Sequence, residues 1–348
     1  MSDQRQKVLL TGGAGFIGSH LAEALLRRGT QLIIVDNLNS YYDCTLKKDN
    51  LEAISRVGKY EFHALDICEM AQLSQVVASH GPEVVIHLAA CVGVRPSIRE
   101  PRFYEQVNIA GTLNLLELCR QFHVHRFIFG SSSSVYGATS CVPFSENQVE
   151  LRPLSPYAAT KLAGEMLAYT YAHLFGLQTI CLRFFTVYGP RQRPDLAIRK
   201  FTALLEAGEP LPIFGDGSMA RDYTYVDDIV AGILASLAPQ MSFPLGGPPF
   251  EVFNLGNSHA VRLTELIELL EHVTGRKARC EWRPLQPGDV PLTWADTSKA
   301  RRVLGYRPAT SLEEGLTRFV RWYRNQLQDA RRLQECLKSE TVERSFQT

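Results

Sequence analysis

Short apolar runs and longer amphipathic segments alternate over the first half of the chain. The runs are rich in β-branched residues and predict strands at 7–11, 31–36, 60–66, 83–89, 126–131 and 178–184. Between them, segments such as FIGSHLAEALLRRG and NIAGTLNLLELCRQF carry apolar residues at helical spacing. Continuous apolar strands separated by helices indicate a parallel sheet that is covered on both faces. The pattern predicts an α/β fold, a Rossmann-type doubly wound parallel sheet.

The pattern changes after Phe185, where proline and glycine become frequent. A strand-like piece at 251–257 and a helix-like piece, DDIVAGILASL, are expected to return to the first domain. The predicted organisation is a first domain at 1–184 that also takes in 223–257, and a smaller C-terminal lobe at 185–222 and 258–328. Residues 329–348 form a charged tail without a clear apolar face, and the sequence leaves its order open.

The composition is that of a soluble globular protein, since 45% of the 348 residues are apolar and 21% are charged. The net charge of +1 gives no electrostatic reason to expect nucleic acid or a membrane surface as a partner. No apolar run approaches the ~20 residues of a membrane-spanning helix, and the start of the chain lacks the features of a secretory signal. The eight cysteines are scattered, without a CxxC pair or a Cys/His cluster. We expect a reduced, cytoplasmic protein without a metal site.

A glycine-rich stretch, TGGAGFIGSHL, directly follows the first predicted strand and opens a helix. Gly12, Gly15 and Gly18 allow a tight turn and the close approach of backbone to a pyrophosphate, which would lie at the positive end of the helix. Phe16 and Ile17 are expected to line the same site. The strand before the stretch and the helix after it support a dinucleotide-binding loop, since glycines alone are weak evidence.

An acidic residue, Asp36, ends the second predicted strand, and Asn37 follows it. A carboxylate there accepts hydrogen bonds from a ribose diol and repels a 2′-phosphate, which favours NAD over NADP; the alternative is an aspartate that caps a turn. Asp66 and Ile67 follow the third strand and are placed to reach the adenine ring. Leu88, Ala89 and Ala90 of HLAA are expected beneath the cofactor, next to a histidine that is more typical of a core than of catalysis.

A tyrosine and a lysine, Tyr157 and Lys161, are four residues apart in SPYAATKLAGE and would project from one face of a helix. Ser155 suits the N-cap of that helix and Pro156 its first turn. A phenol with a pKa of ~10 is a poor base at neutral pH. We expect the lysine ammonium and the nicotinamide cation to lower the pKa of Tyr157, which could then take a proton from a substrate hydroxyl.

Taken in order, these motifs resemble those of the NAD-dependent nucleotide-sugar epimerase/dehydratase family of extended short-chain dehydrogenases/reductases, over nearly the whole chain. The resemblance rests on TGGAGFIGSH, HLAA, NIAGT, SSSSVYG, SPYAATK, RFFTVYGPRQRPD, GDGSMARDYTYVDD and PGDV. Within the family, VGVRPS, FFTVYGPRQRPD and PGDVPLTWADTSKARRVLGY are typical of UDP-glucuronate 4-epimerases. The resemblance implies NAD as cofactor, with Asn108 in its site, a UDP-sugar substrate, and a homodimer formed through helices around 100–121 and 157–175.

The serines of GSSSSVYG distinguish epimerisation from the other reactions of the family that the chain resembles. It implies that Ser132 bonds the sugar 4-hydroxyl beside Tyr157. At Ser133 and Ser134 the similar sugar-nucleotide 4,6-dehydratases carry Asp-Glu, and the decarboxylases carry a Glu before VYG. Without these acids, the simplest fate of a 4-keto sugar is to receive its hydride back. The sequence thus favours an NAD-dependent nucleotide-sugar 4-epimerase, most simply one that converts UDP-glucuronate to UDP-galacturonate.

A UDP-uronate substrate needs its carboxylate bound and restrained. Ser132, Ser133, Ser134 and Thr186 offer hydroxyls to the uronate carboxylate, and Arg193 offers a bidentate guanidinium. Arg191 is a second candidate for that contact, and for both arginines the alternative is a solvated side chain of a loop. The resemblance also implies that Arg221 binds the diphosphate and that Asp289 contacts the nucleotide ribose. The alternatives are a UDP-glucose or UDP-N-acetylglucosamine 4-epimerase, a decarboxylase or dehydratase, and a protein without catalysis that senses NAD.

Overall fold

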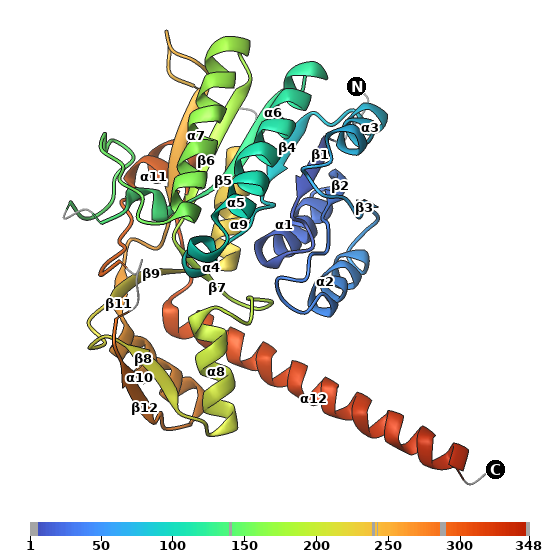
Figure 1. The fold of residues 1–348 in the computed structure, drawn as a ribbon, viewed down its shortest axis with the longest axis vertical. Helices are drawn as coiled ribbons and strands as arrows, with labels where there is room; N and C mark the ends of the chain where they lie inside the picture. The colour runs from blue at the N-terminus through green and yellow to red at the C-terminus, as the bar shows by residue number, and fades with distance from the viewer. Residues whose placement is uncertain (1–5, 139–140, 239–240, 242, 286–289, 346–348) are drawn as a thin grey trace.

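A central parallel sheet of seven strands organises the chain (Figure 1). The computed structural model describes residues 6–138, 141–238, 241, 243–285 and 290–345, with side chains up to residue 329. The strands lie in the order β10 (Phe250–Leu255), β6 (Gln178–Phe184), β5 (Arg126–Ser132), β4 (Val84–His87), β1 (Lys7–Thr11), β2 (Gln31–Val35) and β3 (Glu61–His63). The strand order reverses direction on either side of β1, as in a doubly wound sheet. The predicted fold class is confirmed.

Alternate residues along each strand pack into two separate hydrophobic cores, because successive side chains of a strand point to opposite faces of the sheet. On one face, Leu10 and Ile34 pack with residues of α1 (Phe16–Arg27) and α9 (Val226–Ser236). On the other face, Leu9 and Ile33 pack with residues of α3 (Met70–His80), α6 (Gly111–Gln121) and α7 (Pro156–Phe175). The two cores explain why the strands are apolar throughout.

Several strands are shorter than their apolar runs, mainly at their carboxyl ends. β2 ends at Val35, β3 at His63 and β4 at His87, so Asp36, Asp66 and Leu88 fall in the loops that follow. In open α/β sheets, ligands bind at this edge. α2 (Thr45–Ser55), α4 (Val94–Arg99), α5 (Pro101–Glu105) and the π-helical turn η1 (Gln106–Ala110) lie in or after these loops.

The second lobe is built mostly from the chain after Phe185. It holds a three-stranded sheet of β11 (Ala260–Arg262), β9 (Ala220–Tyr225) and β7 (Thr186–Tyr188), and a pair formed by β12 (Cys280–Arg283) and β8 (Leu211–Phe214). Its helices α8 (Ala197–Ala207) and α10 (Leu263–Thr274) pack on one another, and α11 (Ser298–Leu304) packs against β10 and α9. β10 pairs with β6 of the main sheet, where the sequence expected residues 251–257 to return.

The last helix, α12 (Leu312–Ser345), starts in the body of the protein and projects away from it (Figure 1). Its first turns are anchored by Leu316, Phe319 and Val320, which are buried in the core shared with α1 and α9. The backbone of the charged tail, whose order the sequence left open, is helical to Ser345.

Candidate active site

A cavity of about 880 Å³ opens where the sheet ends meet the second lobe. Most of the residues predicted from the sequence line it. They are Gly12, Gly15, Phe16, Ile17, Gly18, Asp36, Asn37, Asp66, Ile67, Leu88, Ala89, Ala90, Ser132, Ser133, Ser134, Tyr157, Lys161, Thr186, Arg193 and Arg221. Arg191 and Asn108 are not among the described residues that line the cavity, and Asp289 lies outside the described residues.

The glycine loop leaves room for a ligand only because it carries no side chains. Gly12 has a φ of +73°, and a Cβ there would lie 2.7 Å from the backbone nitrogen of Ala89. A Cβ on Gly18 would lie 2.1 Å from the carbonyl oxygen of Gly12. The loop is therefore folded tightly against the first turn of α1, whose residues Phe16, Ile17 and Gly18 line the cavity, and a helix N-terminus favours an anionic group. This cradle fits the pyrophosphate of a dinucleotide.

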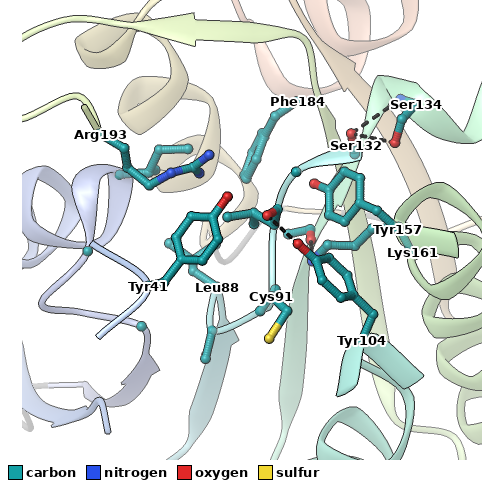
Figure 2. Close-up of a pocket in the computed structure, with 18 of the residues that line it drawn as sticks. Tyr41, Leu88, Cys91, Tyr104, Ser132, Ser134, Tyr157, Lys161, Phe184 and Arg193 are labelled. Carbon is teal, nitrogen blue, oxygen red and sulfur yellow. Dashed lines mark hydrogen bonds between the residues drawn. The ribbon is translucent and has the colours of Figure 1, made fainter. Parts of the chain in front are cut away.

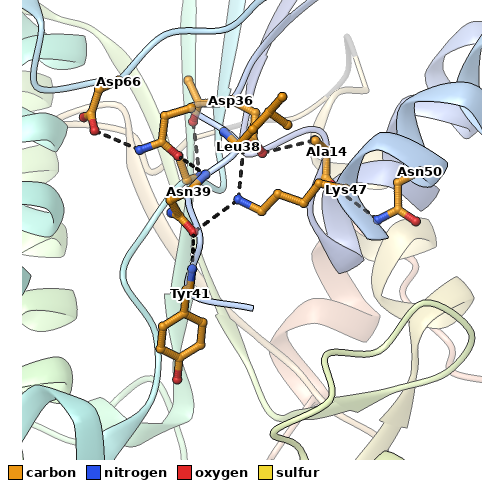
Figure 3. A network of polar contacts seen from close by, with 11 residues as sticks. Ala14, Asp36, Leu38, Asn39, Tyr41, Lys47, Asn50 and Asp66 are labelled. Atoms are coloured by element: carbon orange, nitrogen blue, oxygen red, sulfur yellow. Dashed lines mark hydrogen bonds and ion pairs between the residues drawn. The ribbon is translucent and has the colours of Figure 1, made fainter. Parts of the chain in front are cut away.

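The carboxylate of Asp36 lies at the centre of a polar network beside this loop (Figure 3). It accepts hydrogen bonds from the backbone N–H of Ala14 at 3.2 Å and of Leu38 at 2.9 Å. It also pairs with the buried ammonium of Lys47 at 3.1 Å. Asn37 donates to Asp66 at 2.8 Å, so both acidic residues predicted to meet the adenosine belong to one network. This edge fits a ribose diol.

Lys47 was missed by the sequence reasoning, which looked for a cation only directly after Asp36. It comes from the first turn of α2, and no local motif marks it, because its contact with Asp36 depends on how α2 packs. The ion pair offsets part of the negative charge of Asp36. The repulsion of a 2′-phosphate by Asp36 is therefore weaker than an isolated carboxylate would give.

Asn108 lies behind the cavity wall, which differs from the prediction that it contacts the cofactor. Its amide donates to the carbonyl oxygen of Cys91 at 2.9 Å and to the hydroxyl of Thr160 at 3.0 Å. Its carbonyl oxygen accepts from the N–H of Cys91 at 2.8 Å. Asn108 thus links the loop after β4 to α7 and fixes the backbone of that loop, which lines the cavity. The neighbouring His87 is buried between the hydroxyls of Thr11 and Thr112, as expected for a core histidine.

Tyr157 and Lys161 project from the first turns of α7. Ser155 caps this helix by accepting a hydrogen bond from the N–H of Ala158 at 3.2 Å, and Pro156 follows the cap. The Lys161 ammonium donates to the carbonyl oxygen of Gly130 at 2.8 Å and lies 4.9 Å from the centre of the Phe129 ring. Its burial lowers its pKa to about 8. α7 thus fixes both side chains against the end of β5.

The pKa of Tyr157 is raised by burial, while hydrogen bonding with Ser132 and the positive charge of Arg193 act in the opposite direction. The sequence predicted that the Lys161 ammonium and the nicotinamide cation lower this pKa. In the described structure the lowering comes from Ser132 and Arg193, and the Lys161 ammonium bonds the Gly130 carbonyl oxygen. Figure 2 shows the polar ends of Arg193 and Tyr157 directed toward one another across the cavity.

The serines form the end of β5 and the turn after it. The Ser132 hydroxyl accepts from the N–H of Ser134 at 3.2 Å and from its hydroxyl at 2.9 Å, which starts the 3₁₀ turn η2 (Ser133–Tyr136). Among the described residues, the carboxylates that line the cavity are Asp36, Asp66 and Glu100. None of them comes from the serine segment, so the floor beside Tyr157 is built from hydroxyls.

A buried ion pair lies directly beneath this floor. Glu165 of α7 binds Arg183 of β6 through two hydrogen bonds of 2.9 and 2.7 Å, and it accepts from the Ser131 hydroxyl at 2.5 Å. The side chains of Glu165 and Arg183 are 0% and 4% exposed. The guanidinium also lies 4.7 Å from the centre of the Tyr136 ring. The sequence reasoning missed this pair, because its members come from two separate elements.

The three predicted arginines lie in different surroundings. Arg193 lines the cavity and pairs with Asp195, and Arg221 of β9 lines it from the second lobe. Arg191 has a φ of +64° and binds Glu23 of α1 at 2.5 Å. Arg191 therefore ties its loop to α1, and its prediction as a substrate contact is not supported by its position.

A dinucleotide cradle on a doubly wound sheet, with a tyrosine and a lysine on one helix at its end, defines a short-chain dehydrogenase/reductase. The family model described as "GDP-mannose 4,6 dehydratase" matches residues 9–319, so the chain belongs to this family of nucleotide-sugar enzymes. The resemblance drawn from the motifs is confirmed.

Relatives and solved structures agree with this placement. A UDP-glucuronate 4-epimerase of Thermodesulfobacterium geofontis is 44% identical over 321 residues, which are 92% of this chain and 97% of that protein. A UDP-glucuronic acid 4-epimerase from Bacillus cereus, in complex with UDP-glucuronic acid and NAD, gives a TM-score of 0.85 at 38% identity, over 92% of this chain and 100% of that one. A UDP-glucose 4-epimerase from Thermotoga maritima, with UDP-glucose, gives 0.83 at 37%, over the same shares.

Proposed function

We propose that the protein interconverts UDP-glucuronate and UDP-galacturonate by NAD-dependent epimerisation at C4 of the sugar. The observation that carries this proposal is the combination of Tyr157, a floor of serines without a carboxylate, and an arginine that faces both across one cavity. The similarity to the UDP-glucuronate 4-epimerases of Thermodesulfobacterium geofontis and Bacillus cereus supports the same reaction. NAD-dependent C4 epimerisation fits each of these features.

The cofactor supplies the redox chemistry, since the nicotinamide of bound NAD accepts a hydride from C4 and gives it back. Tyr157 accepts the proton of the 4-hydroxyl, and Ser132 holds that hydroxyl in line with it. Arg193 favours the phenolate through its charge. The pKa of Lys161 is lowered to about 8 by burial, and its ammonium anchors α7 to the carbonyl oxygen of Gly130.

Two other fates of a 4-keto sugar depend on the group at C6, and the site disfavours both. A hexose with a 6-hydroxyl can lose water across C5 and C6, but this needs an acid and a base, and Ser133 and Ser134 supply neither. A uronate has no 6-hydroxyl and can instead lose CO₂. Loss of CO₂ needs the carboxylate to stand perpendicular to the ring, and Arg193 can restrain it. With the diphosphate anchored at Arg221, the sugar turns over and C4 receives its hydride on the opposite face.

A neutral UDP-hexose is the second candidate substrate, favoured by the similarity to the Thermotoga maritima enzyme. The two candidates differ in one group, the C6 carboxylate. The Arg193 guanidinium lines the cavity, its side chain is only 17% exposed, and it can pair with a carboxylate, which a neutral sugar lacks. The uronate therefore uses one more interaction that the site offers.

The test is a side-by-side assay of UDP-glucuronate and UDP-glucose, without added NAD, with products identified by NMR. The proposal predicts UDP-galacturonate from the first and at most slow turnover of the second. Tyr157→Phe is expected to abolish turnover and to leave bound NAD in place. A pentose, a 4-keto-6-deoxy sugar, or turnover restricted to UDP-glucose would contradict the proposal.

A homodimer is the assembly that we propose for this enzyme. Apolar side chains stand exposed on α5, α6 and α7, the helices that the family resemblance assigns to a four-helix interface; they are Phe103, Leu113, Met166, Tyr169, Leu174 and Phe175. Such a patch on neighbouring helices is typical of an interface. Light scattering that gives the mass of one chain would contradict this proposal.

The cytoplasm is the compartment that we propose. Within the described part of the chain, no helix combines the length and the apolar character needed to span a bilayer. The described cysteines are all free thiols, which fits a reducing compartment. Cell fractionation that finds the protein outside the cytoplasm would contradict the proposal.

A further inference from the structure

The side chain of Arg193 is held from two sides. Its Nε donates to Oδ1 of Asp195 at 2.9 Å, and its Nη2 donates to Oδ2 at 2.8 Å. The guanidinium also lies 5.7 Å from the centre of the Tyr41 ring, and the Tyr41 hydroxyl is 3.5 Å from Asp195. Tyr41 belongs to the loop after β2, whereas Arg193 and Asp195 precede α8. The contact therefore joins the two halves of the cavity.

The geometry of the ion pair leaves one side of the guanidinium available. Both hydrogen bonds to Asp195 use the edge formed by Nε and Nη2. A guanidinium carries five N–H donors in one plane, so the edge formed by Nη1 and Nη2 can bind a second carboxylate. Arg193 lines the cavity, whereas Asp195 is not among its described lining residues and its side chain is 40% exposed. Asp195 thus meets the cavity through Arg193 and through the hydroxyl of Tyr41, which also lines it.

The backbone of this loop is held without the Asp195 side chain. The N–H of Gln192 donates to Gly189 at 3.1 Å, and the N–H of Leu196 donates to Arg193 at 3.2 Å. Arg199 of α8 donates to the carbonyl oxygen of Gln192 at 2.5 Å. A change of the Asp195 side chain should therefore release the direction of Arg193 and leave the loop in place.

We propose that Asp195 is a positioning residue that fixes Arg193 side-on, so that the other edge of the guanidinium holds the substrate carboxylate and keeps it from being lost as CO₂. This inference rests on the proposed function. Loss of CO₂ from the 4-keto uronate breaks the C5–C6 bond. Its electron pair moves to C5 and the C4 oxygen, and C5 then takes a proton from solvent. Return of the hydride to C4 completes a UDP-pentose, so each such failure leaves a pentose in the product.

The first test measures the ratio of UDP-pentose to UDP-galacturonate formed from UDP-glucuronate. Asp195→Ala is expected to raise this ratio about tenfold, since small misplacements of a positioning group have effects of this order or larger. Asp195→Asn keeps one acceptor oxygen, so its ratio of UDP-pentose to UDP-galacturonate should lie between those of Asp195→Ala and the wild type. Asp49→Asn, which changes an exposed carboxylate on α2, is the matched control and should not change the ratio. An unchanged ratio in Asp195→Ala would refute the inference.

The second test measures binding in the Tyr157→Phe background, where no product forms. Asp195→Ala should weaken the binding of UDP-glucuronate about tenfold, whereas the affinity for UDP-glucose, which has no carboxylate, should not change. Equal losses for both ligands would indicate general damage and overturn the inference. Tighter binding of UDP-glucuronate would show that Asp195 competes for Arg193, and would overturn it too. A wild-type enzyme that forms no UDP-galacturonate would instead overturn the proposed function.

Discussion

The ion pair between Glu165 and Arg183 provides a sharp test of how the floor of the site is supported. Glu165→Gln preserves the shape of the side chain but removes its charge and turns one acceptor into a donor. Arg183 is then a buried cation with no counterion, and its Nη1 already has no hydrogen-bond partner among the described residues. Breaking one side of a buried pair costs about 3–5 kcal/mol. The same substitution weakens the support of Ser131.

The expected loss converts to a measurable shift in the unfolding temperature. The entropy of unfolding is roughly 2.1 cal/mol/K per residue, or about 0.7 kcal/mol/K for a chain of this size. The midpoint of thermal unfolding should therefore fall by about 4–7 °C. Circular dichroism of the NAD-bound protein measures this midpoint. Glu150→Gln is the matched control, because its pair with Arg152 is exposed and worth at most about 1 kcal/mol.

A double variant, Glu165→Met with Arg183→Met, distinguishes the cost of one unpaired buried charge from the contribution of the whole ion pair to stability. Replacing a whole buried ion pair by apolar residues is often close to neutral, so the double variant should be more stable than Glu165→Gln. The reasoning fails if Glu165→Gln unfolds at the wild-type midpoint. It also fails if the double variant is less stable than the single one, since the cost would then come from lost packing.

Two further predictions concern the cofactor loop and the buried lysine. Gly18→Ala places a Cβ 2.1 Å from the carbonyl oxygen of Gly12 and should reduce the amount of bound NAD, measured after release by acid denaturation, about tenfold. Gly247→Ala is the control and should not change the amount of bound NAD, because the space around Gly247 is open. The Lys161 ammonium has its pKa lowered to about 8, so between pH ~8 and ~10.4 the unfolded chain binds more protons than the folded chain and native stability rises with pH. Lys161→Met should lack this rise, which is about 2 kcal/mol between pH 7 and 9.5, in urea unfolding at these two pH values. A wild-type NAD content in Gly18→Ala, or parallel pH profiles, would count against the respective prediction.

The sequence was most informative where one local signal fixes both structure and position. The glycine loop, the acidic residue after β2 and the Tyr157–Lys161 pair each follow from a motif on a predicted strand or helix. The structure brings them together in one cavity because the carboxyl ends of parallel strands meet at one edge. The strands themselves were predictable because their apolar runs are buried on both faces.

The sequence was least informative where a contact joins distant elements. Lys47 meets Asp36 through the packing of α2, and Glu165 meets Arg183 across α7 and β6. The two arginines of GPRQRPD are only two residues apart, yet Arg193 lines the cavity and Arg191 binds Glu23 of α1. The direction of a side chain depends on tertiary packing, and the spacing of residues along the chain does not predict it.

The fate of the hydrogen on C4 tests the central claim most directly. UDP-glucuronate deuterated at C4 should give UDP-galacturonate that retains deuterium at C4 in ordinary water, because the hydride leaves to the bound cofactor and returns to the same carbon. The complementary reaction of unlabelled substrate in D₂O should introduce no deuterium at C4 or C5. Loss of the label to solvent, or its appearance at another carbon, would contradict the account.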